Sequence, residues 1–379
     1  MSTRHRVIEL RAHRTLSRSG TLLLAAIVAA FATARARADD QEVIPPTEAA
    51  DSRTIIETIE RGIDGAYALG MRPSMRDAHA KAHGCVRADF TVDANIPAEL
   101  RKGVFAQAKS YKAWIRFSNG AGTPHNDQSG DGRGMAIKLT GVSGRKLLTE
   151  QADAQTQDFL MINHPAFFVR NVADYVPFTQ LSLLNKADEF LDKHPNAKSV
   201  VTAITSKIVN GAFNQRYFSM VPYMLGEAYI KFSARPVVCT SGATITESTA
   251  PEPKDDPDFL RNRMAAWLGK TDACFKFSVQ PQTDRATQPI EDPTIAWDEQ
   301  KAPFIDVASI RIPRQTFDTN AQRAFCENLS YTPWHTLPEH RPVGGINRLR
   351  KELYETISKL RHWLNKAPRA EPTGDETFN

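Results

Sequence analysis

The sequence predicts one α+β domain in which helices surround an antiparallel sheet or barrel. Stretches in which apolar and polar residues alternate, as in half-buried strands, occur over residues 85–169 and again over 229–282. Segments with apolar residues at helical spacing precede, separate and follow these stretches. The sequence contains no internal repeat and no sharp change of composition, so a single domain over residues 49–366 is favoured.

The first 38 residues have the three parts of a secretory signal peptide. An arginine-rich start is followed by an apolar run over residues 21–34 and by Ala-Arg-Ala at 36–38. The apolar run is shorter than the ~20 residues that span a bilayer, so no stable membrane span is expected. We therefore expect a signal peptide over residues 1–38, a linker over 39–48 and a periplasmic or secreted protein. An uncleaved amphipathic anchor and a misread start codon are the alternatives.

The composition is that of a globular protein, with 41% hydrophobic and 24% charged residues. The net charge of +5 is concentrated in the basic start, so the mature surface is near neutral and gives no reason to expect a nucleic-acid partner. No Cys-x-x-Cys-His motif occurs, which excludes covalent attachment of a c-type haem. The cysteines match no zinc-binding spacing, and an exported protein can pair them in disulfides whose pattern the sequence leaves open: Cys85, Cys239, Cys274 and Cys326.

The amino-terminal half is expected to begin with a helix and to continue with strands. Ile55, Ile59 and Ile63 recur on one side of a helix over residues 52–70. Strand-like stretches follow, separated by loops rich in Gly, Asp and Asn: residues 85–92, 112–120, 134–142 and 158–169.

The carboxy-terminal half alternates helical and strand-like segments. Helices are expected over residues 172–213, 257–268 and 347–361, and strands over 229–239 and 274–282. In the last helix, Leu349, Leu353 and Ile357 recur at spacings of four. Residues 367–379 are mostly polar and are expected to form a disordered tail.

Several residues that can do chemistry share a face of a predicted element. His79 and His83 lie on one face if their segment is extended; on a helix they would be spaced like a metal-binding pair, but no third ligand is suitably placed. Arg350, Tyr354 and Arg361 lie on one face of the last helix. Taken singly, each group has a structural alternative, a hydrogen-bonded core histidine or a solvated basic helix face.

Four motifs taken together resemble those of the catalase superfamily, and most closely its compact bacterial catalase-like members. They occur in the family's order over residues 76–361, which is nearly all of the mature chain. The motifs are Arg76-Asp77-Ala78-His79-Ala80-Lys81-Ala82; Arg116-Phe117-Ser118 followed by a loop that ends in Arg133-Gly134; Asn163-His164-Pro165-Ala166-Phe167-Phe168; and Arg350, Tyr354 and Arg361. The resemblance implies an antiparallel β-barrel with surrounding helices, and a haem b between the barrel and the last helix.

The resemblance also implies that three residues act on the distal side of the haem. His79 would take a proton from hydrogen peroxide at the iron and return it to the outer oxygen. Ser118 would orient His79, and Asn163 would position the peroxide. The reaction would pass through an oxoferryl intermediate, which a second peroxide or an organic electron donor would reduce.

On the proximal side, the resemblance makes Tyr354 the iron ligand. A phenol titrates near ~10, so its ionisation at neutral pH needs the ferric iron and a positive neighbour. Arg350 lies one helical turn away and can serve as that neighbour. Three further residues are expected to bind the haem propionates: Arg76, Arg116 and Arg361.

The chain departs from the family pattern at two histidines. His83 stands where the family motif has a small residue, and His164 replaces a threonine beside Asn163. His83 is therefore a second candidate for the distal base. The chain also lacks room for the amino-terminal arm and carboxy-terminal extensions of full-length catalases, which weakens the case for efficient peroxide dismutation.

Three functions fit the sequence. The first is a haem-dependent peroxidase or catalase that removes peroxide outside the cytoplasm, with an organic donor as a second partner. The second is conversion of fatty-acid hydroperoxides, as in relatives that share this core. The third is haem binding or storage without catalysis. The presence of His79, Ser118 and Asn163 argues against the third, because a carrier does not need all three.

Overall fold

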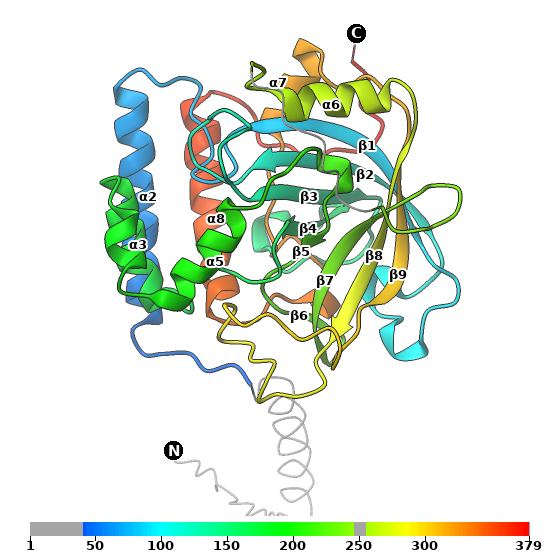
Figure 1. Cartoon of the computed structure of the whole chain (residues 1–379), viewed down its shortest axis with the longest axis horizontal. Coiled ribbons are helices and arrows are strands. Elements are labelled where there is room, and N and C mark those ends of the chain that lie inside the picture. Colours follow the sequence, from blue (N-terminus) through cyan, green and yellow to red (C-terminus); the bar gives the residue numbers. More distant parts are fainter. Residues whose placement is uncertain (1–40, 246–254, 379) are drawn as a thin grey trace, which may run out of the picture. The chain divides into compact units, whose positions relative to one another are not determined.

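The computed structural model describes residues 41–245 and 255–378, in which nine strands form one antiparallel sheet that closes on itself. The strand order is β5-β4-β3-β2-β1-β9-β8-β7-β6, and β5 also pairs with β7. Eight strands therefore make a closed barrel, and β6 extends the sheet along β7. Figure 1 shows this barrel with helices along one side and across one end. The predicted α+β fold with an antiparallel barrel is confirmed.

A helix comes first, strands follow it, and the remaining helices lie between and after the strands. The strands are β1 (Ala82–Val92), β2 (Ser110–Asn119), β3 (Arg133–Thr140), β4 (Thr156–Ile162), β5 (Tyr217–Phe218), β6 (Tyr223–Leu225), β7 (Ala228–Val237), β8 (Ala273–Pro281) and β9 (Ile305–Ile312). The helices of the described residues are α2 (Glu48–Ala68), α3 (Val172–Leu183), α4 (Ala187–Leu191), α5 (Pro195–Thr205), α6 (Phe259–Leu268), α7 (Asn320–Asn328) and α8 (Gly345–Leu364).

Aromatic side chains fill the barrel. Phe90, Phe159 and Phe277 come from three different strands, and their ring centres lie 5.0 to 6.2 Å apart. All three rings are buried, and they leave a cavity of only about 10 Å³ beside them. The barrel is thus a packed core, so a site for a large ligand must lie outside it, between barrel and helices.

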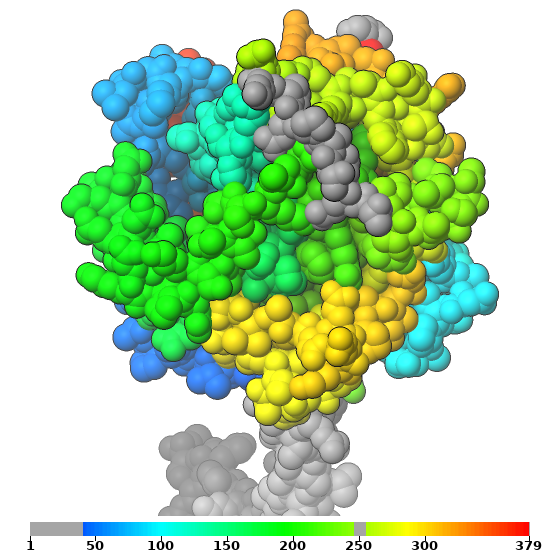
Figure 2. Space-filling view, in the orientation of Figure 1, coloured from blue at the N-terminus to red at the C-terminus, as the bar shows by residue number. Residues whose placement is uncertain are grey.

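Helices α2, α3 and α8 pack against one another beside the barrel (Figure 1). Of the predicted apolar stripe on α2, Ile55 is fully buried, while Ile59 and Ile63 are half-buried. They meet Leu353 and Ile357 of α8, which recur at the spacing that the sequence predicted. In the space-filling view, α3 to α5 form the surface at the left, and the loop between β8 and β9 forms the surface at the bottom (Figure 2).

Some elements differ from the predicted ones. Strand β4 ends at Ile162, and residues 163–169 form an irregular loop because the chain turns at a proline. The helical segment predicted over 172–213 is three helices, interrupted at Asn185, whose φ is 58°. Strand β9 and helix α7 were not predicted, although alternate residues of β9 from Ala308 to Ile312 are buried.

Both ends of the predicted domain are held more firmly than expected. Glu42, in the predicted linker, has a side chain that is only 8% exposed and lies 2.8 Å from Arg348 of α8. The predicted disorder of the tail is wrong for residues 367–378, because Glu371 lies 2.7 Å from the ammonium of Lys138, which is completely buried in β3. Ion pairs hold this segment in place, and ion pairs leave no helical or strand periodicity in the sequence.

Two disulfides join distant segments: Cys85–Cys326 links β1 to α7, and Cys239–Cys274 links the end of β7 to β8. The sequence had left this pairing open. The predicted signal peptide, residues 1–38, lies outside the described residues. Within the described ranges, no helix is long and apolar enough to cross a membrane.

Candidate functional site

His79 lies between α2 and β1, where backbone contacts fix an uncommon conformation. Its φ of 59° is in the left-handed region, and its N–H donates to the Gly120 carbonyl at 2.9 Å. The ring Nδ1 lies 3.0 Å from Oγ of Ser118 on β2. A Cβ at Gly134 would come within 2.6 Å of both atoms, so only glycine at this position of β3 leaves room for the pair. The structure thus brings together two residues singled out from the sequence.

The electrostatic surroundings keep the His79 imidazole neutral. Burial and the charge of Arg116 lower the pKa of His79 to about 4, although Asp131 acts in the opposite direction. Arg116 is close because its Nη2 donates to the His79 carbonyl at 2.8 Å. At neutral pH the ring is therefore uncharged and able to accept a proton.

Three arginines predicted to bind an anionic group converge on Glu327 at the end of α7. The Glu327 Oε1 lies 2.6 Å from Nη1 of Arg76 and 3.2 Å from Nη1 of Arg361. Burial and the charge of Arg76 lower the pKa of Arg116 to about 9, while Glu327 acts to raise it. The Arg116 Nε is buried and has no hydrogen-bond partner among the residues that the structure describes. This cluster holds three positive charges against one carboxylate, and it can accept a further anion.

Asn163 lies one residue beyond β4, near the His79–Ser118 pair but bonded to other groups. Its Oδ1 accepts from the Arg133 N–H at 2.7 Å, and its Nδ2 donates to a buried glutamine side chain at 3.4 Å. Gly134 pairs with Ser118 on β2 and with the residue before Asn163 on β4. The side chains singled out from three motifs therefore lie on, or directly beside the ends of, neighbouring strands at one end of the barrel.

The other two histidines have different surroundings. His83 sits at a bulge of β1, and its ring is fully buried with Oδ2 of Asp127 at 3.8 Å. His164 is half-buried in the loop after β4. Within residues 41–245 and 255–378, no group of three or more His, Cys, Asp or Glu side chains is arranged to hold a metal ion. The structure places Ser118 beside His79 and not beside His83.

Tyr354 and Arg350 lie one turn apart on α8. The Arg350 guanidinium is 5.1 Å from the ring centre of Phe167, in the loop after β4. Burial raises the pKa of the Tyr354 phenol, and the charge of Arg350 acts to lower it. Arg350 acts in the same way on Tyr175 of α3, whose pKa burial also raises. Because Arg350 also lowers the pKa of His79, the barrel side and the α8 side of the site are within electrostatic reach of each other.

Comparison with known proteins agrees with this arrangement. The sequence profile of the catalase family matches residues 71–341 of the 379-residue chain. The chain belongs to the catalase family. Helix α8, with Tyr354, lies beyond the matched residues. Among curated proteins, none matches the sequence.

Solved catalase structures share the fold of this catalase-family chain. A fungal catalase aligns with a TM-score of 0.65 and 16% identity over 83% of this chain and 66% of its own. Catalase A from Saccharomyces cerevisiae aligns with a TM-score of 0.64 and 18% identity, over 83% of this chain and 67% of its own. A bacterial catalase aligns with a TM-score of 0.61 and 17% identity, over 82% of this chain and 62% of its own. The chain thus spans about two thirds of the length of these catalases, and at such identities the likeness shows the fold alone.

Catalases generally bind haem, and the residues described above fit such a group. Guanidinium groups match propionate carboxylates in charge and geometry, and Glu327 already places one carboxylate among the arginines. His79 and Tyr354 keep part of their surface accessible, although burial dominates their pKa shifts. Since the barrel interior is filled, a group of this size cannot lie inside the barrel.

Two residues of the site were missed from the sequence. Gly134 was quoted as part of a motif without a role, although glycine inside a strand often marks a close approach of other groups. Glu327 belongs to no motif, and it reaches the arginines because the disulfide at its neighbour Cys326 fixes α7 against β1. The contact of Glu327 with the arginines is revealed only by the structure.

Proposed function

We propose that this catalase-family protein binds haem b between the barrel and α8 and uses it to decompose peroxide in a catalase or peroxidase reaction. Tyr354 is the iron ligand, and the arginine cluster at Glu327 binds the propionates. The observation that carries the proposal is the neutral His79–Ser118 pair at the end of the barrel, within electrostatic reach of Arg350, which also acts on Tyr354 of α8. When bound, the haem iron supplies the redox chemistry of peroxide cleavage.

His79 moves the proton in this scheme. If Nδ1–H donates to the Ser118 Oγ at 3.0 Å, Nε2 is left bare and can take a proton from peroxide. The charge of Arg116 and the loss of water hold the ring neutral before the reaction, and the same neighbours make the protonated ring a strong acid. His79 therefore returns its proton readily to the departing oxygen.

Asn163 and Arg350 orient and tune the reacting groups. The Asn163 carbonyl oxygen is held by the Arg133 N–H, which fixes the amide and leaves an N–H of Nδ2 to orient the peroxide. On the other side, the positive Arg350 favours the ionised form of Tyr354, which burial alone opposes.

Three assays run side by side on haem-loaded protein test this function: oxygen evolution from hydrogen peroxide, oxidation of an organic donor, and conversion of a fatty-acid hydroperoxide. We expect hydrogen peroxide to be consumed in the first or second assay. Protein that is fully loaded with haem but consumes no hydrogen peroxide would contradict the proposal. Conversion of the fatty-acid hydroperoxide alone would favour the alternative enzyme.

We also propose that the protein acts outside the cytoplasm after removal of residues 1–38. The two disulfides support this, because disulfides persist in oxidising compartments and are rare in the cytosol. Mass spectrometry of protein recovered from its native compartment should give an amino terminus at or near Asp39. An intact chain in the cytoplasmic fraction would overturn the assignment.

A further inference from the structure

The three helices beside the barrel, α2, α3 and α8, end close to one another. α2 and α8 run parallel, because Arg348 pairs with Glu48 where the two helices begin, and the Tyr67 hydroxyl donates to the last carbonyl of α8 at 3.0 Å. Figure 1 shows both helices ending at the top of the view. α3 ends beside them, since a Cβ at Gly62 of α2 would come within 2.9 Å of the Leu183 side chain.

Each of these helix ends leaves large apolar side chains in solvent. Leu69, directly after α2, is 85% exposed, and Trp363, in the last turn of α8, is 73% exposed. Three further apolar side chains at these ends are exposed: Met71, Leu183 and Leu184. These five residues, which we call the helix-end surface, are five of the eleven large apolar residues that the described part of the chain exposes. Such grouping differs from the single apolar residues that are scattered over any protein surface.

Ordered turns hold these apolar side chains in place. Each helix is closed by one residue in the left-handed region: Gly70 after α2 with a φ of 88°, Asn185 after α3 with 58°, and Lys366 after α8 with 52°. The Gly70 N–H donates to the Tyr67 carbonyl at 3.1 Å, and the Lys366 N–H donates to the Trp363 carbonyl at 3.2 Å. The helix-end surface therefore consists of hydrogen-bonded helix caps and not of frayed helix ends.

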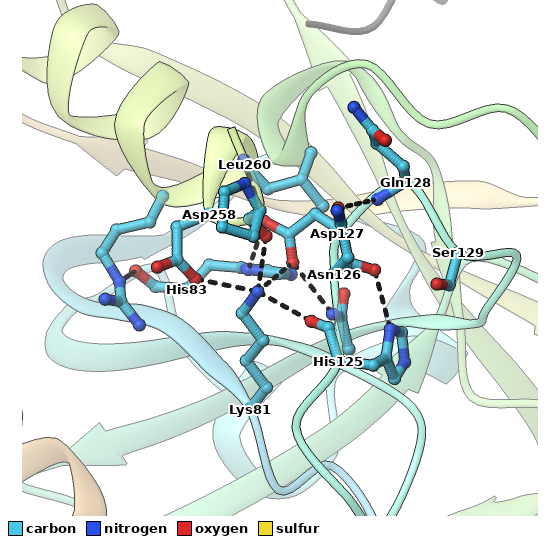
Figure 3. Close-up of polar contacts among 12 residues, drawn as sticks. Lys81, His83, His125, Asn126, Asp127, Gln128, Ser129, Asp258 and Leu260 are labelled. Carbon is cyan, nitrogen blue, oxygen red and sulfur yellow. Dashed lines mark hydrogen bonds and ion pairs between the residues drawn. The ribbon is translucent and has the colours of Figure 1, made fainter. Parts of the chain in front are cut away.

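Two exposed cations border the helix-end surface. Arg72 stacks on the Tyr67 ring, with its guanidinium 4.4 Å from the ring centre, and Lys366 closes α8. Among the described residues, neither cation forms an ion pair. They differ in this from Lys81, whose ammonium lies 2.8 Å from each of two aspartates (Figure 3). Arg72 and Lys366 therefore keep their charges available to an anionic partner.

A lipid surface matches this combination of groups. Side chains that project from three separate helix ends can each enter a fluid layer, which deforms around them. The Trp363 ring is apolar, and its indole N–H, which has no partner in the described part of the chain, can stay among polar headgroups. Cations beside such apolar groups are attracted to anionic headgroups.

We propose that the helix-end surface docks this protein on an anionic phospholipid membrane. Leu69, Met71 and Trp363 enter the boundary between headgroups and acyl chains, and Arg72 and Lys366 contact the headgroups. Docking of this kind lies in the plane of the interface and needs no spanning helix. It does not depend on haem chemistry, so a failure of the docking and a failure of the proposed function are separate results.

Co-sedimentation of the protein, recovered from its native compartment, with lipid vesicles tests the docking. One set of vesicles is phosphatidylcholine alone, and the other also contains phosphatidylglycerol. We expect the wild type to bind the second set at least tenfold more tightly than the first. The double variant Leu69→Ser, Trp363→Ser should bind the second set at least tenfold more weakly than the wild type, because both apolar anchors are lost.

Ile44→Ser is the matched control, because Ile44 is 66% exposed and precedes α2, at the opposite end of that helix. It should bind within about twofold of the wild type. Lys366→Gln should weaken binding to the phosphatidylglycerol vesicles about fivefold, the usual effect of one cation near an anionic membrane. Trp363→Phe keeps an apolar ring and should bind within about threefold, but it should lose the blue shift of tryptophan emission that these vesicles cause in the wild type.

No binding of the wild type to either set of vesicles, or equal binding by the double variant, would overturn the proposal. Unshifted tryptophan emission in vesicle-bound wild type would overturn it as well. Dimerisation of the wild type in solution that the double variant abolishes would assign the helix-end surface to a second copy of the chain, and the lipid assignment would then be wrong.

Discussion

At His79, a positive φ, a neighbouring glycine and a buried arginine act on one imidazole. The left-handed backbone directs the ring toward Ser118, Gly134 leaves the space for it, and Arg116 holds the backbone carbonyl while its charge keeps the ring neutral. Motif spacing was sufficient to single out His79 and Ser118 from the sequence. It could not reveal the arrangement, because the contacts come from residues more than 30 positions apart.

Replacement of His79 by alanine should remove the proton carrier without disturbing the packed barrel. We expect the rate of reaction of haem-loaded protein with hydrogen peroxide to fall by about 10² to 10⁴, the usual value of general acid–base help. Stopped-flow absorbance, with haem occupancy matched to the wild type, measures this rate.

His164→Ala is the control for this experiment, because His164 is a half-buried imidazole in the loop after β4 that we assign no role. Its rate should stay within about threefold of the wild type. A His79→Ala protein that reacts as fast as the His164→Ala control would show that the distal base has been misassigned.

Among the elements, α8 was the most predictable and the carboxy-terminal tail the least. The apolar residues of α8 recur every four positions and meet α2, so periodicity alone located the helix and its buried face. The tail has no periodicity, and side-chain contacts hold it: Glu371 reaches the buried Lys138, Glu376 accepts from the Trp114 indole, and the Phe378 ring packs on Trp114. Such contacts depend on where the strands lie in space, which the local sequence does not encode.

Glu371→Ala tests whether the tail is part of the fold. Lys138 would keep Asp158 at 2.7 Å but lose one of its two carboxylates, and we expect the free energy of unfolding to fall by about 2 to 4 kcal/mol. Asp375→Ala removes a carboxylate that pairs with the exposed Lys112, and it should cost less than about 0.5 kcal/mol. Urea denaturation of both variants makes the comparison, and equal stabilities would mean that Glu371 does not hold the tail on β3.

For the whole molecule, the alternating strands and the motif order were sufficient to predict an antiparallel barrel with helices beside it. The closure of the sheet through β5 was not predictable, because β5 has only two residues and too little sequence to show alternation. The disulfide pairing was likewise open, since Cys85 and Cys326 are 241 residues apart and meet only after α7 docks on β1.

Buried neutral histidines should make the protein sensitive to mild acid. Burial lowers the pKa of His340 to about 3, and its Nε2 accepts from the Val104 N–H. As the pH falls, the unfolded chain, with a histidine pKa near 6.5, takes up a proton before the folded chain does. The stabilisation by the neutral ring is therefore fully present above pH 6.5 and is lost as the pH falls below it. Between pH 7.5 and 5.5, each such histidine should cost about 1.4 kcal/mol of unfolding free energy.

Urea denaturation at these two pH values, for the wild type and His340→Gln, isolates this contribution. The variant keeps an acceptor for the Val104 N–H but has no group that titrates, so its loss of stability on acidification should be about 1.4 kcal/mol smaller. Identical losses in the two proteins would show that His340 is not a buried neutral histidine.

The central claim is that a haem sits between the barrel and α8 with Tyr354 on its iron, and the absorption spectrum of ferric haem added to the purified protein tests it most directly. We predict a five-coordinate, high-spin tyrosinate spectrum for the wild type and for Tyr175→Phe, which removes the neighbouring buried phenol of α3. Tyr354→Phe should bind haem at least tenfold more weakly or give a clearly different spectrum. An unchanged spectrum and affinity in Tyr354→Phe would contradict the account.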